Sequence, residues 1–292
     1  MNDRSASWLF DLGNTRLKWA CLDGDVLGKV HALPHAESER SDERLDRAFA
    51  EIEAGATAWL ASVASDARAA DVTGALERCG ARVCRVHTQS GFAGVQIAYA
   101  EPARLGVDRF LALIAAHARG PRPWLIVGVG TALTLDLLDT DGTHLGGLIA
   151  PSPMLMRESL AQRAPQLPAQ GGAVVDFATA TLDALASGCT LMARALVERS
   201  LHAAAQRLLI RHSNRVNALP FPSAAAAGED KGGGIDSVDS IKICAESIGA
   251  MPTLLLSGGG AMALGDNWPA PFEREPHLVL HGLRLWAQAQ AG

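Results

Sequence analysis

The feature that most constrains this chain is an apolar run that breaks at a glycine-bearing turn and occurs twice. The first copy reads SWLFDLGNTRLKWA over residues 7–20, and the second reads PWLIVGVGTALTLDLL over residues 123–138. In both copies strand-like residues flank the turn, and a second turn with the letters DG follows. An internal duplication of about half the chain explains this repeat. It predicts two similar domains, at 1–121 and 122–292.

The rest of the chain alternates between strand and helix patterns, which is typical of an α/β protein. Strands are expected at 7–13, 17–22, 59–63 and 82–87, in three pieces within 123–151, and at 253–261. Helices are expected at 41–54, 67–79, 108–119, 181–212 and 281–290. Residues 223–240 are small and polar with a glycine triplet, so we expect a mobile surface loop there.

The composition argues against several classes of function. The net charge is −5 and the chain has only four lysines, so we expect neither nucleic acid nor a membrane as a partner. The N-terminal letters MNDRSASW lack the apolar core of a signal peptide, and no run reaches about 18 apolar residues. The five cysteines are scattered and form no C-x-x-C pair, which favours reduced thiols and a cytoplasmic location.

The turn at residues 11–14 allows two interpretations. Gly and Asn tolerate the positive φ of a tight hairpin, whereas an Asp beside backbone amides can hold Mg²⁺ near a nucleotide. The chain has no P-loop and no G-x-G-x-x-G segment after its first strand, and Gly128-x-Gly130 opens a strand rather than a helix. A nucleotide would therefore meet the amides of hairpin turns. The repeat of the turn at 128–131 favours this phosphate-facing interpretation.

A second group of chemistry-bearing residues lies in YAEPARLGVDRFLALIAA, residues 99–116. Asp108 and Arg109 stand at the expected start of a helix, where the helix dipole favours negative charge. Asp108 is expected at the N-cap position, and capping alone would explain it. As a general base, Asp108 would accept the proton of an acceptor hydroxyl, while Arg109 would bind phosphate or a substrate carboxylate.

Two glycine-bearing hairpin turns in duplicated domains resemble the ribonuclease-H-like fold of the actin and hexokinase type. That resemblance implies an α/β chain of two such domains, with ATP in the interdomain cleft. It also implies an Asp near Mg²⁺ at one turn, phosphate binding at the other, and a glycine-rich strand end beside the adenosine. The letters LSGGGA at residues 256–261 suit the last role, and a plain loop explains them as well.

The order of five segments narrows the resemblance to one family. DLGNTRLKW, YAEPARLGVDR, GTALTLD, GGLIAPSPMLMRESL and TATLDALASG follow one another, and the chain resembles a type III pantothenate kinase from about residue 7 to 264. The resemblance implies ATP-dependent phosphorylation of pantothenate to 4'-phosphopantothenate, the first step of coenzyme A biosynthesis, by a homodimer. The same family includes proteins described as accessory transcription factors. A non-enzymatic regulator and a kinase for another small hydroxylated acceptor therefore stay as alternatives.

The resemblance also implies a role for each matching residue. Asp11 would position Mg²⁺, Lys18 would offset phosphate charge, and Asp108 would be the catalytic base. The ATP-phosphate residues are Asp11, Leu12, Gly13, Asn14, Thr15, Arg16, Leu17 and Lys18, with Thr131 at the second phosphate turn. The substrate-binding residues are Tyr99, Gly106, Val107, Asp108, Arg109 and Thr181, the last reaching pantothenate at a dimer interface.

Several of these positions leave a plainer explanation open, and one departs from the family. Lys18 could simply be a solvent-exposed strand residue, and Thr181 could simply be the N-cap of a helix. Tyr99 could be a half-buried aromatic residue whose hydroxyl contacts water. The second turn of the family usually reads Asp-x-Gly-Thr, with the Asp helping to bind K⁺ or NH₄⁺, but Gly128 stands there in this chain. A glycine supplies no carboxylate, so we expect monovalent-cation binding to be lost, weakened or rebuilt from other oxygens.

Overall fold

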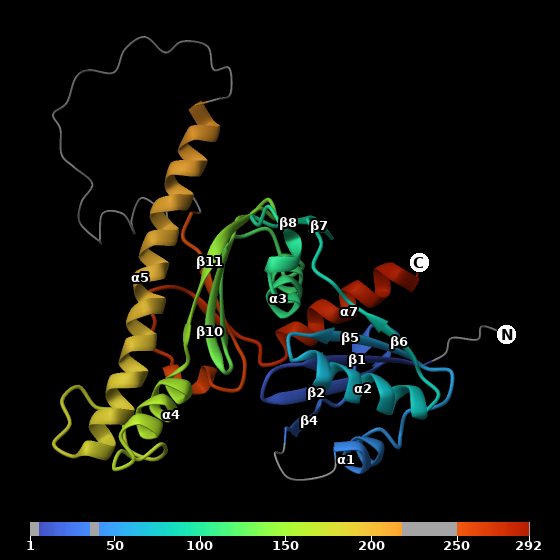
Figure 1. Ribbon diagram of the computed structural model, residues 1–292. Coiled ribbons are helices and arrows are strands. Elements are labelled where there is room, and N and C mark those ends of the chain that lie inside the picture. The colour runs from blue at the N-terminus through green and yellow to red at the C-terminus, as the bar shows by residue number, and fades with distance from the viewer. Residues whose placement is uncertain (1–5, 36–40, 218–249, 292) are drawn as a thin grey trace. The chain divides into compact units, whose positions relative to one another are not determined.

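The computed structural model describes residues 6–35, 41–217 and 250–291 (Figure 1). The loop expected at 223–240 lies outside the described residues. By its contacts the chain divides into two compact units. The first unit comprises Met1–Gly120, Gly142–Gly146 and Glu275–Gly292, and the second comprises Pro121–Asp141 and Gly147–Arg274.

The sheet of the first unit is built around the first repeated hairpin. β1 (Ser7–Leu12) pairs antiparallel with β2 (Arg16–Asp23), so that Asp11 lies opposite Lys18. β5 (Thr57–Ser62) runs parallel to β1 on its other side, and β6 (Arg82–Arg85) runs parallel to β5. The strand order is β3-β2-β1-β5-β6, with β3 at Val26–Leu27 and with β4 (His31–Pro34) also paired to β2. β1 is therefore a central strand, which explains its apolar sequence.

The helices of the first unit include α3 (Val107–His117) and α7 (Leu278–Ala291), which are far apart in the sequence. The full set is α1 (Ser41–Ala48), α2 (Asp66–Arg78), α3 and α7, with β7 (Gly91–Phe92), β8 (Val95–Gln96) and the 3₁₀ turn η1 (Pro102–Arg104) before α3. Ser65 caps α2, because its side chain accepts from Arg68 N–H at 3.5 Å. α7 packs on α3 at Gly282, where a side chain would overlap the Leu111 carbonyl.

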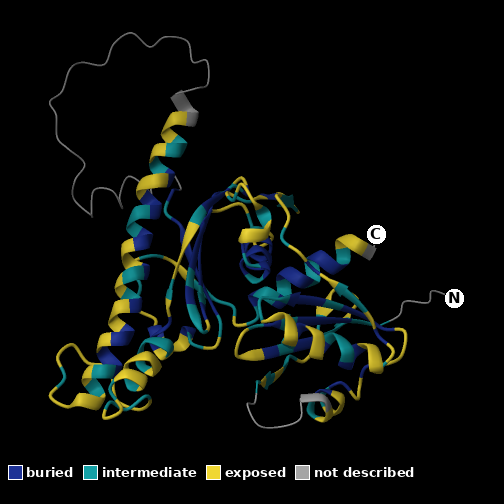
Figure 2. Cartoon of the chain, in the orientation of Figure 1, coloured by how far each residue is buried: buried dark blue, intermediate teal, exposed yellow. Residues whose placement is uncertain are grey.

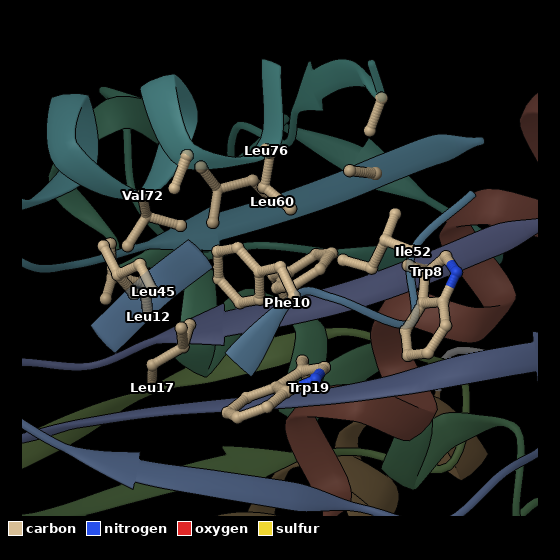
Figure 3. Close-up of a cluster of buried hydrophobic side chains, with 14 of the residues drawn as sticks. Trp8, Phe10, Leu12, Leu17, Trp19, Leu45, Ile52, Leu60, Val72 and Leu76 are labelled. Atoms are coloured by element: carbon tan, nitrogen blue, oxygen red, sulfur yellow. The ribbon is translucent and has the colours of Figure 1, made fainter. Parts of the chain in front are cut away.

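One hydrophobic cluster of the first unit lies between this sheet and the helices α1 and α2 (Figure 3). Trp8, Phe10 and Leu12 alternate along β1 and join one buried cluster with side chains of α1 and α2. Phe10 meets Phe49 edge to face with ring centroids 5.4 Å apart. Because side chains alternate along a strand, Asp11 lies on the opposite face of β1, at the carboxyl end of the strand.

The second unit repeats the arrangement with the second hairpin. β9 (Trp124–Val129) pairs antiparallel with β10 (Ala132–Leu138), and β12 (Thr253–Ser257) runs parallel to β9. The order is β11-β10-β9-β12-β13, with β11 at His144–Pro151 and β13 at Phe272–Arg274. The unit also holds α4 (Pro153–Arg163), the long α5 (Thr181–Asn217) and the 3₁₀ turn η2 (Ala261–Leu264). Ala193, Val197 and Leu201 of α5 join the core formed by β9 and β12.

The two sheets share one arrangement, apart from the extra strand β4 that pairs with β2 in the first unit. In both, the hairpin strands lie side by side, the third strand extends the sheet beyond the second, and a later strand, β5 or β12, runs parallel to the first. This shared order confirms the duplicated ribonuclease-H-like α/β fold expected from the repeat. Figure 2 shows that the central strands of both sheets are largely buried.

Local boundaries differ from the sequence predictions at two instructive places. The sequence prediction puts residues 275–292 in the second domain, whereas α7 groups with the first unit because it packs on α3. The helix expected at 108–119 begins at Val107, with Gly106 as its N-cap residue, so the prediction of Asp108 as the N-cap is wrong.

Membrane-spanning helices and disulfides can both be examined in the described part of the chain. No helix among the described residues is both long and apolar enough to cross a membrane. Cys21, Cys79, Cys84 and Cys189 are free thiols in the described part of the chain.

Candidate active site

The first repeated turn joins β1 to β2 and is held from its flank. His35 donates through Nε2 to the Gly13 carbonyl at 2.9 Å, and Arg68 donates to the Asn14 carbonyl at 2.7 Å. The Thr15 carbonyl accepts from His35 N–H at 3.0 Å. Burial lowers the pKa of His35, and the hydrogen bond to the Gly13 carbonyl opposes this shift. Three successive carbonyls are thus engaged, while Asn14 and Thr15 themselves are exposed to solvent.

Asp11 and Lys18 face each other across the hairpin just before this turn. Burial raises the pKa of Asp11 to about 6, the Lys18 ammonium opposes the shift, and the Asp108 carboxylate adds to it. Lys18 Nζ also donates to the Pro276 carbonyl at 3.4 Å, immediately before α7. Two carboxyl groups and one ammonium therefore share one face of the first unit.

Asp108 lies in the first turn of α3 and is shaped by the residue two places before it. Its Oδ1 accepts from Arg109 N–H at 2.8 Å, so the carboxylate folds back over the helix N-terminus. A Cβ atom at Gly106 would lie 2.6 Å from that Oδ1 and 3.6 Å from a methyl group of Val63. Glycine at 106 is therefore what leaves room for the carboxylate in this position.

Tyr99 and Arg109 form a polar and aromatic cluster with His144. Arg109 is 6% exposed, and its Nη1 donates to the Tyr99 hydroxyl at 3.3 Å. The His144 ring stacks on Tyr99 with centroids 6.1 Å apart and planes 6° from parallel. Arg109 therefore joins the start of α3 to the one tyrosine of the chain.

The second repeated turn belongs to the second unit and is closed by its own backbone. Gly130 N–H donates to the Ala132 carbonyl at 2.9 Å, which leaves Gly130 and Thr131 between the strands. The glycine triplet packs against the end of β9: Gly258 has a φ of +91°, and a Cβ there would lie 2.5 Å from the Val129 carbonyl oxygen. Close backbone approach thus explains the first glycine of the triplet without a ligand.

Gly128 occupies the position in β9 that corresponds to Asp11 in β1. Its neighbours across the sheet are Thr134 on β10 and Ser257 on β12. A Cβ at Gly128 would lie 2.6 Å from Thr134 Oγ1, so this threonine fills the space that a side chain would need. The two hairpins are therefore alike in backbone and differ in charge at this position.

Comparison with known proteins decides which family carries this arrangement. A family model described as type III pantothenate kinase matches residues 8–203. The chain belongs to the type III pantothenate kinase family. A type III pantothenate kinase of Stenotrophomonas maltophilia (strain K279a) is 42% identical over 98% of both chains. One of Xylella fastidiosa (strain M23) is 42% identical over 100% of this chain and 99% of its own.

A solved structure agrees with the fold of this kinase. The crystal structure of a Baf family protein from Campylobacter jejuni matches with a TM-score of 0.52, at 16% identity, over 97% of this chain and 98% of that one. At such low identity the match shows the fold alone. Together with the family matches, it confirms the fold and the kinase family that the five ordered segments predict.

The residues predicted for this kinase are divided between the two units. Asp11–Lys18, Tyr99 and Gly106–Arg109 lie in the first unit, whereas Thr131 and Thr181 lie in the second. Thr181 is exposed and is the first residue of α5. Ala184 N–H donates to the Ala180 carbonyl at 2.9 Å, so Ala180 stands at the cap position and the N-cap interpretation of Thr181 loses its support.

A kinase of this family uses ATP with a divalent metal ion, and Asp11 fits the part of a ligand. Its carboxylate is partly buried and feels the charge of the Asp108 carboxylate, so a cation there would offset a charge that the fold destabilises. No group of three or more His, Cys, Asp or Glu side chains in the described part of the chain is arranged to hold a metal ion. Such a site suits a divalent ion that keeps waters and binds through one or two carboxylates and substrate phosphates.

Three residues of the site, His35, Arg68 and His144, are not predicted by any sequence pattern. Each acts on a predicted residue from far along the chain: His35 and Arg68 on the first turn, His144 on Tyr99. None stands in a motif with a defined spacing, so the sequence carries no local signal for them. Only the folded chain shows which residues hold the predicted ones in place.

Proposed function

We propose that this chain transfers the γ-phosphoryl group of ATP to the primary hydroxyl of pantothenate, forming 4'-phosphopantothenate and ADP. This is the first step of coenzyme A biosynthesis. The observation that carries the proposal is the first-unit site in a member of this family: Asp108 folded over the start of α3, beside Asp11 and one residue before the buried Arg109. Within the first unit, Asp108 would supply the base, Asp11 the metal ligand, and Arg109 the positive charge for substrate anions.

In the proposed mechanism Asp108 accepts the hydroxyl proton of pantothenate as the oxygen attacks the γ-phosphorus. The bond between that phosphorus and the oxygen bridging to the β-phosphate breaks, and ADP leaves with the bonding pair. Phosphoryl transfer needs little covalent chemistry from the protein, so catalysis rests on positioning and charge stabilisation. Tyr99, Gly106, Val107 and Arg109 are assigned to pantothenate, and the Arg109 guanidinium suits its carboxylate.

We assign ATP phosphates to the first hairpin, residues 11–18, and phosphate contact in the second unit to Thr131. The Lys18 ammonium offsets phosphate charge, and the exposed Asn14 and Thr15 present the solvent side of the turn. Asp11 is the residue that would hold Mg²⁺. When bound, Mg²⁺ neutralises negative charge on the phosphates.

A homodimer is part of the proposal, and the second unit offers a surface for it. Ile149, Met154, Phe177 and Met192 are more than half exposed, and Leu148 is 48% exposed. They come from β11, α4, α5 and the segment between the two helices, where much of the surface is exposed or intermediate (Figure 2). A second copy covering this apolar surface would remove it from water, and Thr181 would then reach the partner's substrate.

The proposal also covers the response to monovalent cations and the location in the cell. We infer that monovalent-cation stimulation is lost or weakened, because Gly128 has no carboxylate and only Thr134 and Ser257 flank it across the sheet. A cytoplasmic location stays a prediction from the sequence.

In the deciding experiment, purified protein is incubated with MgATP and a panel of small hydroxylated acceptors that includes pantothenate. We expect phosphorylation of pantothenate and a loss of roughly 10²- to 10⁴-fold in kcat for Asp108→Asn. Asp71→Asn is the matched control, because Asp71 is an exposed residue within α2 and is not among the residues assigned to the site. Turnover of another acceptor only would replace the substrate, and normal turnover by Asp108→Asn would remove the proposed base. No turnover of any acceptor would favour a regulatory member of the family.

A further inference from the structure

The turn between β10 and β11 crosses into the first unit and docks on the segment that carries Tyr99. Gln96 N–H donates to the Gly142 carbonyl at 2.9 Å, and Gln96 forms a parallel bridge with Thr143. Gly142 has a φ of +80°, and a side chain there would overlap the Gly94 carbonyl. This close backbone contact requires glycine. Residues Gly142–Gly146 therefore group with the first unit, although they follow a strand of the second.

His144 belongs to this docked turn, and its side chain lies against the segment that carries Tyr99. It is 1% exposed, and its Nδ1 accepts from Ala98 N–H at 3.3 Å, so the proton of the neutral ring resides on Nε2. The residue next to Ala98 is Tyr99, on whose ring His144 stacks almost parallel. One histidine thus holds both the backbone before Tyr99 and the face of its ring.

Arg109 contacts the same tyrosine. Its guanidinium carbon lies 5.9 Å from the centroid of the Tyr99 ring, and its Nη1 donates to the hydroxyl. The orientation of Tyr99 therefore depends on two buried side chains, Arg109 from the start of α3 and His144 from the docked turn.

We propose that His144 is a positioning residue that fixes Tyr99 for pantothenate and so sets the affinity of the site for this substrate. The inference rests on the proposed function, because Tyr99 is assigned to pantothenate there. An aromatic ring with only its backbone fixed samples several rotamers, and binding must then stop that motion. A ring already stacked and hydrogen-bonded loses less freedom when substrate arrives.

The kinetic test compares two substitutions that separate the two contacts of His144. His144→Asn keeps an oxygen acceptor for Ala98 N–H but removes the ring, and His144→Phe keeps a ring but removes the acceptor. Because aromatic pairs contribute modestly, we expect KM for pantothenate to rise about 3- to 10-fold in His144→Asn. KM for ATP should not change, and His144→Phe should recover part of the loss.

A matched control comes from a second histidine stack in the same unit. His31 stacks on Trp19 with centroids 5.2 Å apart and planes 18° from parallel, and neither residue belongs to the proposed site. His31→Asn makes the same chemical change to an aromatic stack. It should leave both KM values unchanged, which separates positioning of Tyr99 from general loosening of the unit.

A second readout reports on Tyr99 directly, without any turnover. Tyr99 is the only tyrosine, so protein labelled with 3-fluorotyrosine gives one fluorine NMR line for the folded state. We expect His144→Asn to shift or broaden this line before substrate is added, whereas His31→Asn should not. Pantothenate should move the wild-type line.

The two readouts distinguish failure of this inference from failure of the proposed function. An unchanged line and an unchanged KM for pantothenate in His144→Asn would overturn the positioning role. If wild type turns over no pantothenate and its line does not respond to pantothenate, the proposed function fails, and with it the substrate part of this inference. If His144→Asn does not fold, His144→Phe carries the test, and wild-type values for it on both readouts would overturn the inference.

Discussion

The Asp108 carboxylate occupies the space that a side chain at Gly106 would take: a Cβ there would lie 2.6 Å from Oδ1. Gly106 is also the N-cap residue of α3, so one position both begins the helix and leaves room for the proposed base. This relationship explains why a glycine stands two residues before the aspartate.

Gly106→Ala should lower kcat by roughly 10- to 100-fold, because the added methyl group displaces the Asp108 carboxylate from its position over the helix. The protein should still fold, since alanine in place of a glycine cap costs about 1 kcal/mol or less. Steady-state kinetics with pantothenate checks the prediction. Gly74→Ala is the control: Gly74 lies within α2, where a Cβ would meet the end of Arg78 at an ordinary 3.5 Å. Equal kcat in wild type and Gly106→Ala would contradict the steric explanation.

The free energy of unfolding should depend on pH through Asp11. Its pKa in the folded protein is raised from 3.8 to about 6, so the folded state binds the proton more tightly than the unfolded state does. This contribution to stability is fully present below pH 3.8 and is lost as pH rises through about 6. At pH 7.5 Asp11→Asn should therefore be more stable than the ligand-free wild type, by at most about 3 kcal/mol.

Denaturant unfolding of wild type and Asp11→Asn between pH 4 and 7.5 tests this sign. The stability difference between the two proteins should shrink towards low pH, where Asp11 is protonated and neutral. A difference that does not vary with pH would show that the Asp11 carboxyl is not destabilised. At pH 7.5 MgATP should stabilise the wild type more than Asp11→Asn, because Asp11 is the proposed ligand of the cation.

Asp139 anchors the end of α5 to β10 in the second unit, and its removal should destabilise the protein. The carboxylate is fully buried and accepts from Arg211 Nε at 2.6 Å, while His212 Nε2 lies at 2.9 Å. Burial alone would raise the pKa of Asp139, but hydrogen bonds from His212, Thr140 N–H and Arg211 outweigh it and lower the pKa. The stability that this carboxylate contributes is therefore present above its unfolded pKa and lost as pH falls through the lower folded value.

Asp139→Ala should lower the free energy of unfolding by about 1–3 kcal/mol, because it removes the buried acceptor that the partly buried Arg211 and His212 share. Asp141→Ala is the matched control. Asp141 pairs with the same Arg211 at 3.2 Å but is 36% exposed, so its loss should cost about 1 kcal/mol or less. Equal costs for the two variants, measured by denaturant unfolding, would show that burial does not decide the strength of this network.

Replacing potassium by a bulky organic cation at constant ionic strength should leave turnover unchanged. Hard cations are held by oxygen ligands, and Gly128 offers no carboxylate where Asp11 stands in the other hairpin. Initial rates in potassium chloride and choline chloride check this expectation. A steep rise with potassium would show that other oxygens, such as those of Thr134 and Ser257, have rebuilt the site.

The repeat in the sequence already determined most of the architecture. Apolar runs, DG turns and glycine-bearing hairpins are local patterns, so two similar α/β halves follow from them, and the ordered segments identified the family. The same patterns located Asp11, Lys18, Asp108 and Arg109, which the structure brings into the first unit. Their roles in binding and catalysis stay predictions, since likeness to a family does not measure them.

Only the tertiary structure decided which distant residues support these positions. α7 packs on α3 rather than in the second unit, His35 and Arg68 hold the first turn, and the docked turn brings His144 onto Tyr99. The N-cap residue of α3 is Gly106 rather than the predicted Asp108, whose carboxylate accepts from the N–H of the next residue, Arg109. The physical reason is the same in each case. Local periodicity determines helices and strands, whereas contacts between residues far apart in the chain arise from packing that no short segment encodes.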